Sequence, residues 1–116
     1  MENREEKLEA LKILMEYNGR LIKNMKILIR ELKEEKLEDT EKLLKDVINV
    51  INWEISIIGS TIDLINEDKE RINKESFNKK IKVLANAIEN KIDKKIAEAL
   101  DELVIEFERL ADMINN

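Results

Sequence analysis

The chain has 116 residues, of which 41% are charged and 3% aromatic, and its formal net charge is −5. This length suits one hydrophobic core, so we expect a single domain over residues 1–116. The absence of cysteine and histidine excludes a disulfide framework, a thiolate or imidazole metal site and a cysteine nucleophile. The negative charge argues against nucleic-acid binding, which needs a basic surface.

Helices are the elements that the composition indicates. There is no proline, only two glycines are present, and Leu, Ile, Lys and Glu dominate the chain. The many Ile, Val and Asn residues could suggest strands, but apolar residues recur with a period of about 3.5 to 3.7 residues and do not alternate. The sequence therefore predicts an all-α fold.

The N-terminal residues are charged where a signal peptide needs an apolar core. No window approaches the 18 or more uninterrupted apolar residues expected of a membrane span. The lack of cysteine also fits a reducing compartment. We therefore expect a cytoplasmic protein that does not bind membranes.

The first helix is predicted over residues 3–35, where one apolar seam has alternating spacings of three and four residues. The seam consists of Leu8, Leu11, Met15, Asn18, Ile22, Met25, Ile29 and Leu32. Leu14, Leu21 and Leu28 widen it into the face of a bundle helix. Asn18 is interpreted as a buried polar residue that fixes register, or as an irregularity with Gly19, in preference to a ligand contact.

The second helix is predicted over residues 40–66, with Asp39 or Thr40 as its N-cap. Two apolar faces distinguish it, so we expect it to be the central helix and to touch two neighbours. One face is Leu44, Ile48, Ile51, Ile55, Ile58, Ile62 and Ile65; the other is Leu43, Val47, Val50, Ile57 and Leu64. Gly59 lies within this helix, and we expect a packing reason for it, since a mid-helix glycine costs about 1 kcal/mol relative to alanine.

After a polar connection at residues 67–74, a last helix is predicted from Phe77 onwards. Its apolar positions repeat every eleven residues. They are Phe77, Ile81, Ala85, Ile88, Ile92, Ile96, Ala99, Leu103, Phe107, Leu110 and Ile114. The unbroken repeat favours continuity, and the alternative is a break near Asn90 with Asp93 capping a new helix. We therefore expect an antiparallel up-down bundle of three long helices, or of four if the last one breaks near Asn90.

Catalytic and ligand-binding chemistry is poorly represented. Carboxylates one turn apart, such as Glu98 with Asp101 and Glu102 with Glu106, are expected by chance among 26 acidic residues, and we interpret them as solvated surface. Gly19 and Gly59 are too far apart to form a phosphate-binding loop. The sequence predicts no catalytic residue, no cofactor and no metal site, and hence a protein that is not an enzyme.

What remains is the surface. Tyr17 and Trp53 are of the residue types enriched at protein interfaces, and Ile13 and Ile27 fall beside the main seam of the first helix. We select Ile13, Tyr17 and Trp53 as candidate partner-binding residues. The alternative is that the two aromatic residues simply cover the edge of the core.

Two resemblances bear on function. Residues 13–22, with Leu14, Met15, Tyr17, Asn18 and Gly19, resemble a segment of the first long helix of flagellin export chaperones, and residues 37–44 resemble the turn and second helix that follow. That resemblance implies a small cytosolic helical bundle that binds a terminal segment of a filament protein in apolar grooves, without cofactors. The chain is also similar to small helical domains of unassigned function from low-GC Gram-positive bacteria, in residues 47–53, 87–91 and 97–110, which implies no particular activity.

The sequence thus predicts a non-enzymatic, export-chaperone-like or adaptor protein that receives an amphipathic helix of a partner beside the second helix. We also expect a homodimer, because long helices in a short chain leave apolar edges uncovered. The alternatives are a structural homo-oligomer with no client and, more distantly, an enzyme that uses carboxylates and lysines alone. A groove predicts that Ile13, Tyr17 and Trp53 are exposed, whereas a closed bundle predicts that they are covered.

Overall fold

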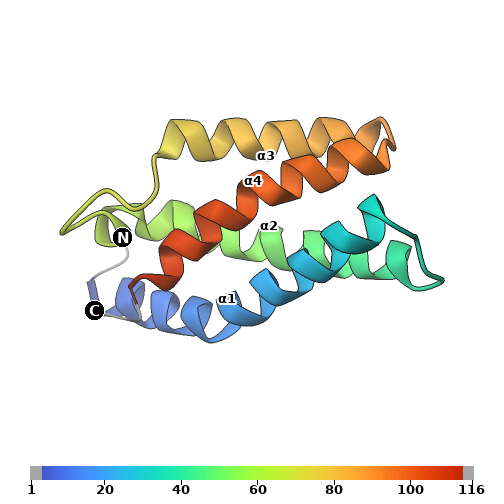
Figure 1. Ribbon diagram of the computed structural model, residues 1–116. Helices are drawn as coiled ribbons and strands as arrows, with labels where there is room; N and C mark the ends of the chain where they lie inside the picture. The colour runs from blue at the N-terminus through green and yellow to red at the C-terminus, as the bar shows by residue number, and fades with distance from the viewer. Residues whose placement is uncertain (1–3, 114–116) are drawn as a thin grey trace.

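The computed structural model describes residues 4–113, and these contain four α-helices and no strand. The helices are α1 (Arg4–Lys33), α2 (Thr40–Ile65), α3 (Lys74–Glu89) and α4 (Asp93–Ala111). They run up, down, up and down along a body of 44 × 25 × 25 Å (Figure 1). The predicted all-α up-down bundle is confirmed, in its four-helix form. The predicted helix start at Asn3 and the apolar position Ile114 lie outside the described residues.

The close helix pairs are α1 with α2, α1 with α4, and α3 with α4. The prediction that the second helix is the central one is therefore wrong, because α1 and α4 each have two close neighbours. Between α2 and α3 the bulky side chains of Ile55 and Ile81 face the same hollow. This hollow of about 80 Å³ separates facing side chains of α2 and α3, and α1 is the one close neighbour of α2 among the described helices.

The inner face of α1 is centred on the residues that the sequence placed beside the seam. Leu14, Leu21 and Leu28 are 0%, 2% and 0% exposed, whereas Leu8, which the seam included, is 47% exposed. The reason is that α1 packs against α2 on one side and α4 on the other, so the most buried stripe points between these two neighbours.

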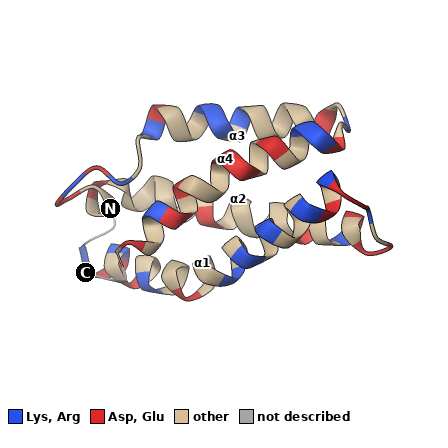
Figure 2. Ribbon diagram, in the orientation of Figure 1, with Lys and Arg blue, Asp and Glu red and all other residues tan. Residues whose placement is uncertain are grey.

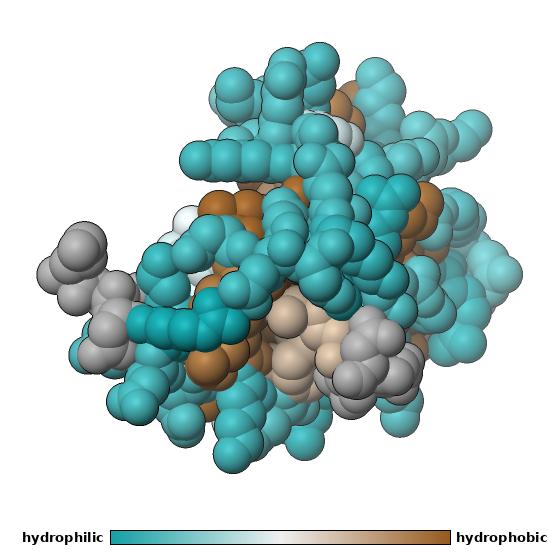
Figure 3. Space-filling view, turned by 90° about the vertical axis from the view of Figure 1, so that its left-hand side faces the viewer, coloured by the Kyte–Doolittle hydropathy of each residue, from teal (hydrophilic) through white to brown (hydrophobic). Residues whose placement is uncertain are grey.

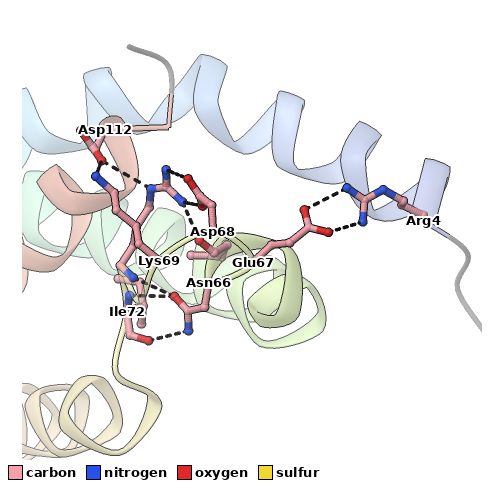
Figure 4. A network of polar contacts seen from close by, with 9 residues as sticks. Arg4, Asn66, Glu67, Asp68, Lys69, Ile72 and Asp112 are labelled. Atoms are coloured by element: carbon pink, nitrogen blue, oxygen red, sulfur yellow. Dashed lines mark hydrogen bonds and ion pairs between the residues drawn. The ribbon is translucent and has the colours of Figure 1, made fainter. Parts of the chain in front are cut away.

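A polar network shapes the connection between α2 and α3 (Figure 4). The Asn66 side chain accepts hydrogen bonds from the backbone N–H groups of Arg71 (2.9 Å) and Ile72 (3.1 Å) and donates one to the Ile72 carbonyl (2.8 Å). Arg71 donates to the Ile65 carbonyl at the end of α2 and lies 3.5 Å from Asp112 beyond α4. The connection is thereby held to the C-terminal ends of α2 and α4. Ile72 is fully buried.

The last predicted helix is broken, which corrects the expectation of continuity. Asn90 ends α3, Lys91 has a left-handed φ of 54°, and α4 begins at Asp93 after the N-cap position Ile92. Asp93 is thus the first helical residue and not the cap. A left-handed lysine costs on the order of 1 kcal/mol, but the reversal lets α4 bury its apolar face against α1 and α3, which outweighs that cost.

Two smaller expectations also change. Asp39 occupies the N-cap position of α2, but its side chain makes no capping hydrogen bond. Thr40 is buried instead, accepting from the Leu37 N–H and donating to Glu31. Gly59 lines a small hollow between α2 and α3 together with Phe77 and Asn78, but an added side-chain carbon would meet no atom within 4 Å, so close packing among the described residues does not require a glycine.

Hydrophilic side chains cover the outside of the bundle and hydrophobic ones lie between the helices. Figure 3 shows this at the end that carries the α2–α3 connection. Ion pairs join α1 to the end of α2 (Arg4 to Glu67) and α1 to α4 (Lys33 to Asp101). Between α1 and α2, the side chains of Ile13, Tyr17 and Trp53 reach solvent.

Candidate functional site: a groove between α1 and α2

Tyr17 of α1 and Trp53 of α2 meet on the outer surface. Their ring centroids are 5.6 Å apart with an interplanar angle of 85°, an edge-to-face arrangement that aromatic pairs favour. Tyr17 is 47% and Trp53 39% exposed. Because α1 and α2 are antiparallel, Tyr17 and Trp53 lie side by side. The ion pair of Lys7 with Asp63, near the N-terminus of α1 and the C-terminus of α2, fits the same alignment of the two helices.

The two rings form part of the wall of a shallow hollow of about 420 Å³, lined by Ile13, Tyr17, Asn49, Val50 and Trp53. Tyr17 and Val50 also line a second hollow of about 220 Å³. Its other lining residues are Arg20, Leu21, Asn24, Asp46 and Val47. Because the hollows share two residues, they form one continuous depression, which we call the α1/α2 groove.

The structure brings the three sequence-predicted residues together: Ile13 (40% exposed), Tyr17 and Trp53 line the same hollow. Within residues 4–113 no other helix covers them. Asn49 and Val50 were not selected from the sequence, although Val50 belongs to the second apolar face of α2 and could have been found there. Ile27 is half-buried and does not line either hollow. The partner-binding role of these residues stays a prediction.

Two buried polar residues are each next in sequence to one of the rings. Asn18, fully buried as predicted, donates a hydrogen bond of 2.9 Å to the Phe107 carbonyl of α4. Glu54 is also fully buried, and neither of its carboxylate oxygens has a hydrogen-bond partner among the described residues. Burial raises the pKa of Glu54 to about 8, so at neutral pH its carboxyl group is mostly protonated.

Glu54 was missed by the sequence analysis. It occupies the position between the two apolar faces of α2, in line with Val47, Ile51 and Ile58, which are all 2% exposed. Its position in the sequence could have identified it, since Glu54 is the only charged residue in residues 47–62.

The carboxylates of α4 were also partly misread. Glu106, interpreted as solvated surface, is fully buried and pairs with Arg109 (3.1 Å) and Lys80 (3.6 Å). Glu102 is exposed, 3.8 Å from the same lysine. Within residues 4–113 no group of three or more acidic side chains is arranged to hold a metal ion.

The charged groups of the groove itself are few. Arg20 and Asp46 line its second hollow, from opposite helices. The hollow around Ile13 and Trp53 is lined by apolar, aromatic and amide side chains alone. Such a lining offers apolar contact and a few hydrogen bonds, which suits the binding of another chain better than chemistry on a small molecule.

The fold and the groove define a small four-helix bundle with an exposed apolar depression. The chain belongs to the family described as a domain of unknown function, DUF8042, whose model matches residues 9–113. This match spans all four helices. No curated protein and no solved structure was found to match the chain.

Helix α2 has one further property. Among the described residues it is the one helix long and apolar enough to cross a membrane by length and composition, a property that core helices of soluble proteins share. Only 33% of the most apolar window of α2 is buried inside the bundle. Much of its uncharged surface is therefore available for contact with something outside the chain.

Proposed function

We propose that this protein is a non-enzymatic interaction module of the cytoplasm, which receives an amphipathic helix of a partner protein in the α1/α2 groove. The observation that carries the proposal is the convergence of Ile13, Tyr17 and Trp53 in one exposed hollow. Helix-in-groove recognition uses such a lining for apolar anchors placed at i, i+3 or i+4, and i+7.

The dimensions of the groove fit a short helix. Its lining on α1 extends from Ile13 to Asn24, which corresponds to about 17 Å at 1.5 Å per residue. A partner helix of about three turns covers that length. Tyr17 and Trp53 would be the main anchors, because large aromatic side chains dominate the binding energy of interfaces.

Charges on α1 support one orientation of the bound helix. The exposed residues Glu9 and Glu16 lie about one turn on either side of Ile13, whereas Arg20 and Lys23 follow Tyr17. A helix N-terminus carries partial positive charge and its C-terminus partial negative charge. The partner helix would therefore run parallel to α1, with its N-terminal end beside the two glutamates.

The resemblance of residues 13–22 to flagellin export chaperones adds to this proposal, because those proteins also bind a helical segment in an apolar groove. The alternative is a structural homo-oligomer with no client, in which a second copy covers the groove. Both proposals make the groove an interface, and they differ in what occupies it.

The test is an affinity capture from a lysate of the source cell with three forms of the protein. They are the wild type, a groove variant (Tyr17→Ala with Trp53→Ala) and a control variant (Leu37→Ala with Val83→Ala). The control removes two exposed apolar side chains, each 58% exposed, that lie outside the groove. We expect one partner to be retained by the wild type and the control and lost by the groove variant.

The binding step can then be measured directly, since Trp53 is the only tryptophan in the chain. A synthetic helix of the captured partner should shift the Trp53 emission to shorter wavelength, and Tyr17→Ala should weaken binding by about 30-fold, as expected of an aromatic anchor. Recovery of this protein alone in the capture would contradict the client proposal and support the structural alternative.

A further inference from the structure

The solvent-facing side of α2 carries no charge over four turns. Residues 47–62 include one charged residue, Glu54, and it is fully buried. The exposed residues of this segment, apart from Trp53 beside the groove, are Asn49, Asn52, Ser56, Gly59 and Ser60. We call these five residues the uncharged ridge. In a chain that is 41% charged the ridge stands out, and the middle of α2 is largely tan in Figure 2. Depletion of charge is a property of interface cores.

Gly59 gives a second, independent observation. It lies in the interior of α2 and is exposed, and added bulk there would meet nothing within 4 Å. A glycine at such a position weakens the helix and gains nothing inside the chain. Glycine and serine on a helix surface do allow the backbone of another helix to approach closely, and Ser56 and Ser60 lie one turn from Gly59 or beside it.

The two ends of the ridge have opposite charge. Lys42 and Lys45 are exposed at the N-terminal end. Asp63 and Glu67 lie at the C-terminal end, where Lys7 and Arg4 of α1 already pair with them. An antiparallel copy of the same helix would place the two lysines beside the acidic end, whereas a parallel copy would oppose like charges.

Residue size along the ridge favours the same antiparallel orientation that charge favours. Asn49 and Asn52 occupy the N-terminal half, and Gly59 and Ser60 the C-terminal half. Antiparallel docking about a twofold axis at Ser56 sets Asn52 of one copy against Ser60 of the other. A parallel arrangement would set large against large, so size and charge select the same orientation.

We propose that a second copy of this chain docks on the uncharged ridge, with the two α2 helices antiparallel and related by a twofold axis near Ser56. The interface is isologous, as in most homodimers. Residues 47–62 cover about 24 Å at 1.5 Å per residue. A contact of this length across the full 25 Å width of the body would bury on the order of 1,200 Å² for the two copies together, the lower end of stable interfaces, so side chains of the neighbouring helices take part beside the ridge. An uncharged ridge also lets two copies of net charge −5 approach without repulsion at the contact.

This inference goes beyond the proposed function, because it uses the outer face of α2; only Asn49 belongs both to the ridge and to the lining of the α1/α2 groove. Sedimentation equilibrium at high micromolar concentration should return twice the 13.7 kDa of the chain. Ser56→Arg should return 13.7 kDa, because it sets two cations against each other at the twofold axis. Ser76→Arg, at an exposed position of α3, is the control and should remain dimeric.

Ser56→Arg changes an exposed side chain, so its circular dichroism and melting as a monomer should show an intact helical fold. A wild-type protein at 13.7 kDa, or a Ser56→Arg variant that stays dimeric, would overturn the proposal. Capture of a partner by a monomeric Ser56→Arg protein would show that the groove works without the dimer, so the two proposals can fail separately.

Orientation has its own test, since the chain contains no cysteine. Ser56→Cys should be cross-linked to a dimer by a short bis-maleimide, whereas Ser76→Cys should not. Lys45→Glu alone should weaken the dimer by repelling Glu67 of the second copy, and adding Glu67→Lys should restore it. Two results would overturn the antiparallel arrangement. One is a dimer in which Ser56→Cys is not cross-linked, and the other is a double charge-reversal variant whose dimer is as weak as that of Lys45→Glu.

Discussion

Helices α2 and α4 each bury one glutamate completely, and the two residues have different surroundings. Glu106 of α4 pairs with Arg109 on its own helix and with Lys80 of α3. Glu54 of α2 has no partner for either oxygen among the described residues, and burial alone raises its pKa to about 8. Burying a carboxylate without a partner is expensive, so Glu54 is retained in its neutral form.

The outer faces of the two helices differ in the same way. On α4, Asp101 and Glu108 are exposed and pair with Lys33 and Lys26 of α1. On α2, the exposed residues from Asn49 to Ser60 are uncharged. Glu106, Asp101 and Glu108 of α4 thus have ion-pair partners within the chain, whereas Glu54 of α2 has no hydrogen-bond partner among the described residues. This difference identifies α2, with the edge of α1 beside it, as the part of the molecule from which we expect contact with another chain.

The largest effect is expected from a charge in the buried face of α2. Ile51 is 2% exposed, and Ile51→Asp would remove a packed side chain and place an unpaired carboxylate in the core. We expect a loss of roughly 5 kcal/mol or more in the free energy of unfolding, which approaches the whole stability of a small domain. Urea or thermal unfolding followed by circular dichroism measures it.

Asn52→Asp is the matched control for that change, because Asn52 is the next residue along the helix and is exposed. It should unfold nearly like the wild type, within about 0.5 kcal/mol. If Ile51→Asp melted at the wild-type temperature, the assignment of this face of α2 to the core would be wrong.

The second effect is a pH dependence that comes from Glu54. Its pKa is raised from 4.5 to about 8 in the folded protein, so the folded state binds the proton more tightly than the unfolded state does. The stability contribution is therefore fully present below pH 4.5 and is lost as the pH rises through 8. At about 1.4 kcal/mol per pKa unit, the loss is roughly 4 to 5 kcal/mol by about pH 9.

Glu54→Gln separates this residue from the other acids. Asp63, Glu67 and Asp68 have lowered pKa values because Lys7, Arg4 and Arg71, respectively, donate hydrogen bonds to them, and their contributions are lost only in acid. The Glu54→Gln variant should match the wild type near pH 5 and exceed it in stability near pH 9. An equal decline of both proteins over this range would exclude Glu54 as its origin.

The smallest effect is expected at the glycine of the outer face. Because a side-chain carbon at Gly59 meets open space, Gly59→Ala should raise the unfolding free energy of the isolated chain by about 0.5 to 1 kcal/mol. Gly19→Ala in α1 is the control, since that position is equally open. Both substitutions should stabilise the monomer, but Gly59→Ala alone should weaken self-association. If the two variants formed dimers of equal strength, Gly59 would not be part of the interface.

The fold class and the bounds of α1 and α2, to within about two residues, could be predicted from the sequence alone. Helical periodicity is a local property, and apolar residues at spacings of three and four over 30 residues of α1 and 26 of α2 suit no other regular structure. The sequence also singled out Ile13, Tyr17 and Trp53, because aromatic and apolar side chains off the main seam have few other uses.

Tertiary structure decided which helix is central and where the last one breaks. An unbroken eleven-residue repeat is compatible with one long helix, and only the burial available to α4 against α1 and α3 makes the left-handed turn at Lys91 worthwhile. The same holds for the polar core. Whether Glu54 or Glu106 faces water depends on where neighbouring helices lie, and whether a buried acid has a partner depends on side chains distant in sequence, such as Lys80. Local patterns carry no information about such contacts, because they arise only when the helices pack.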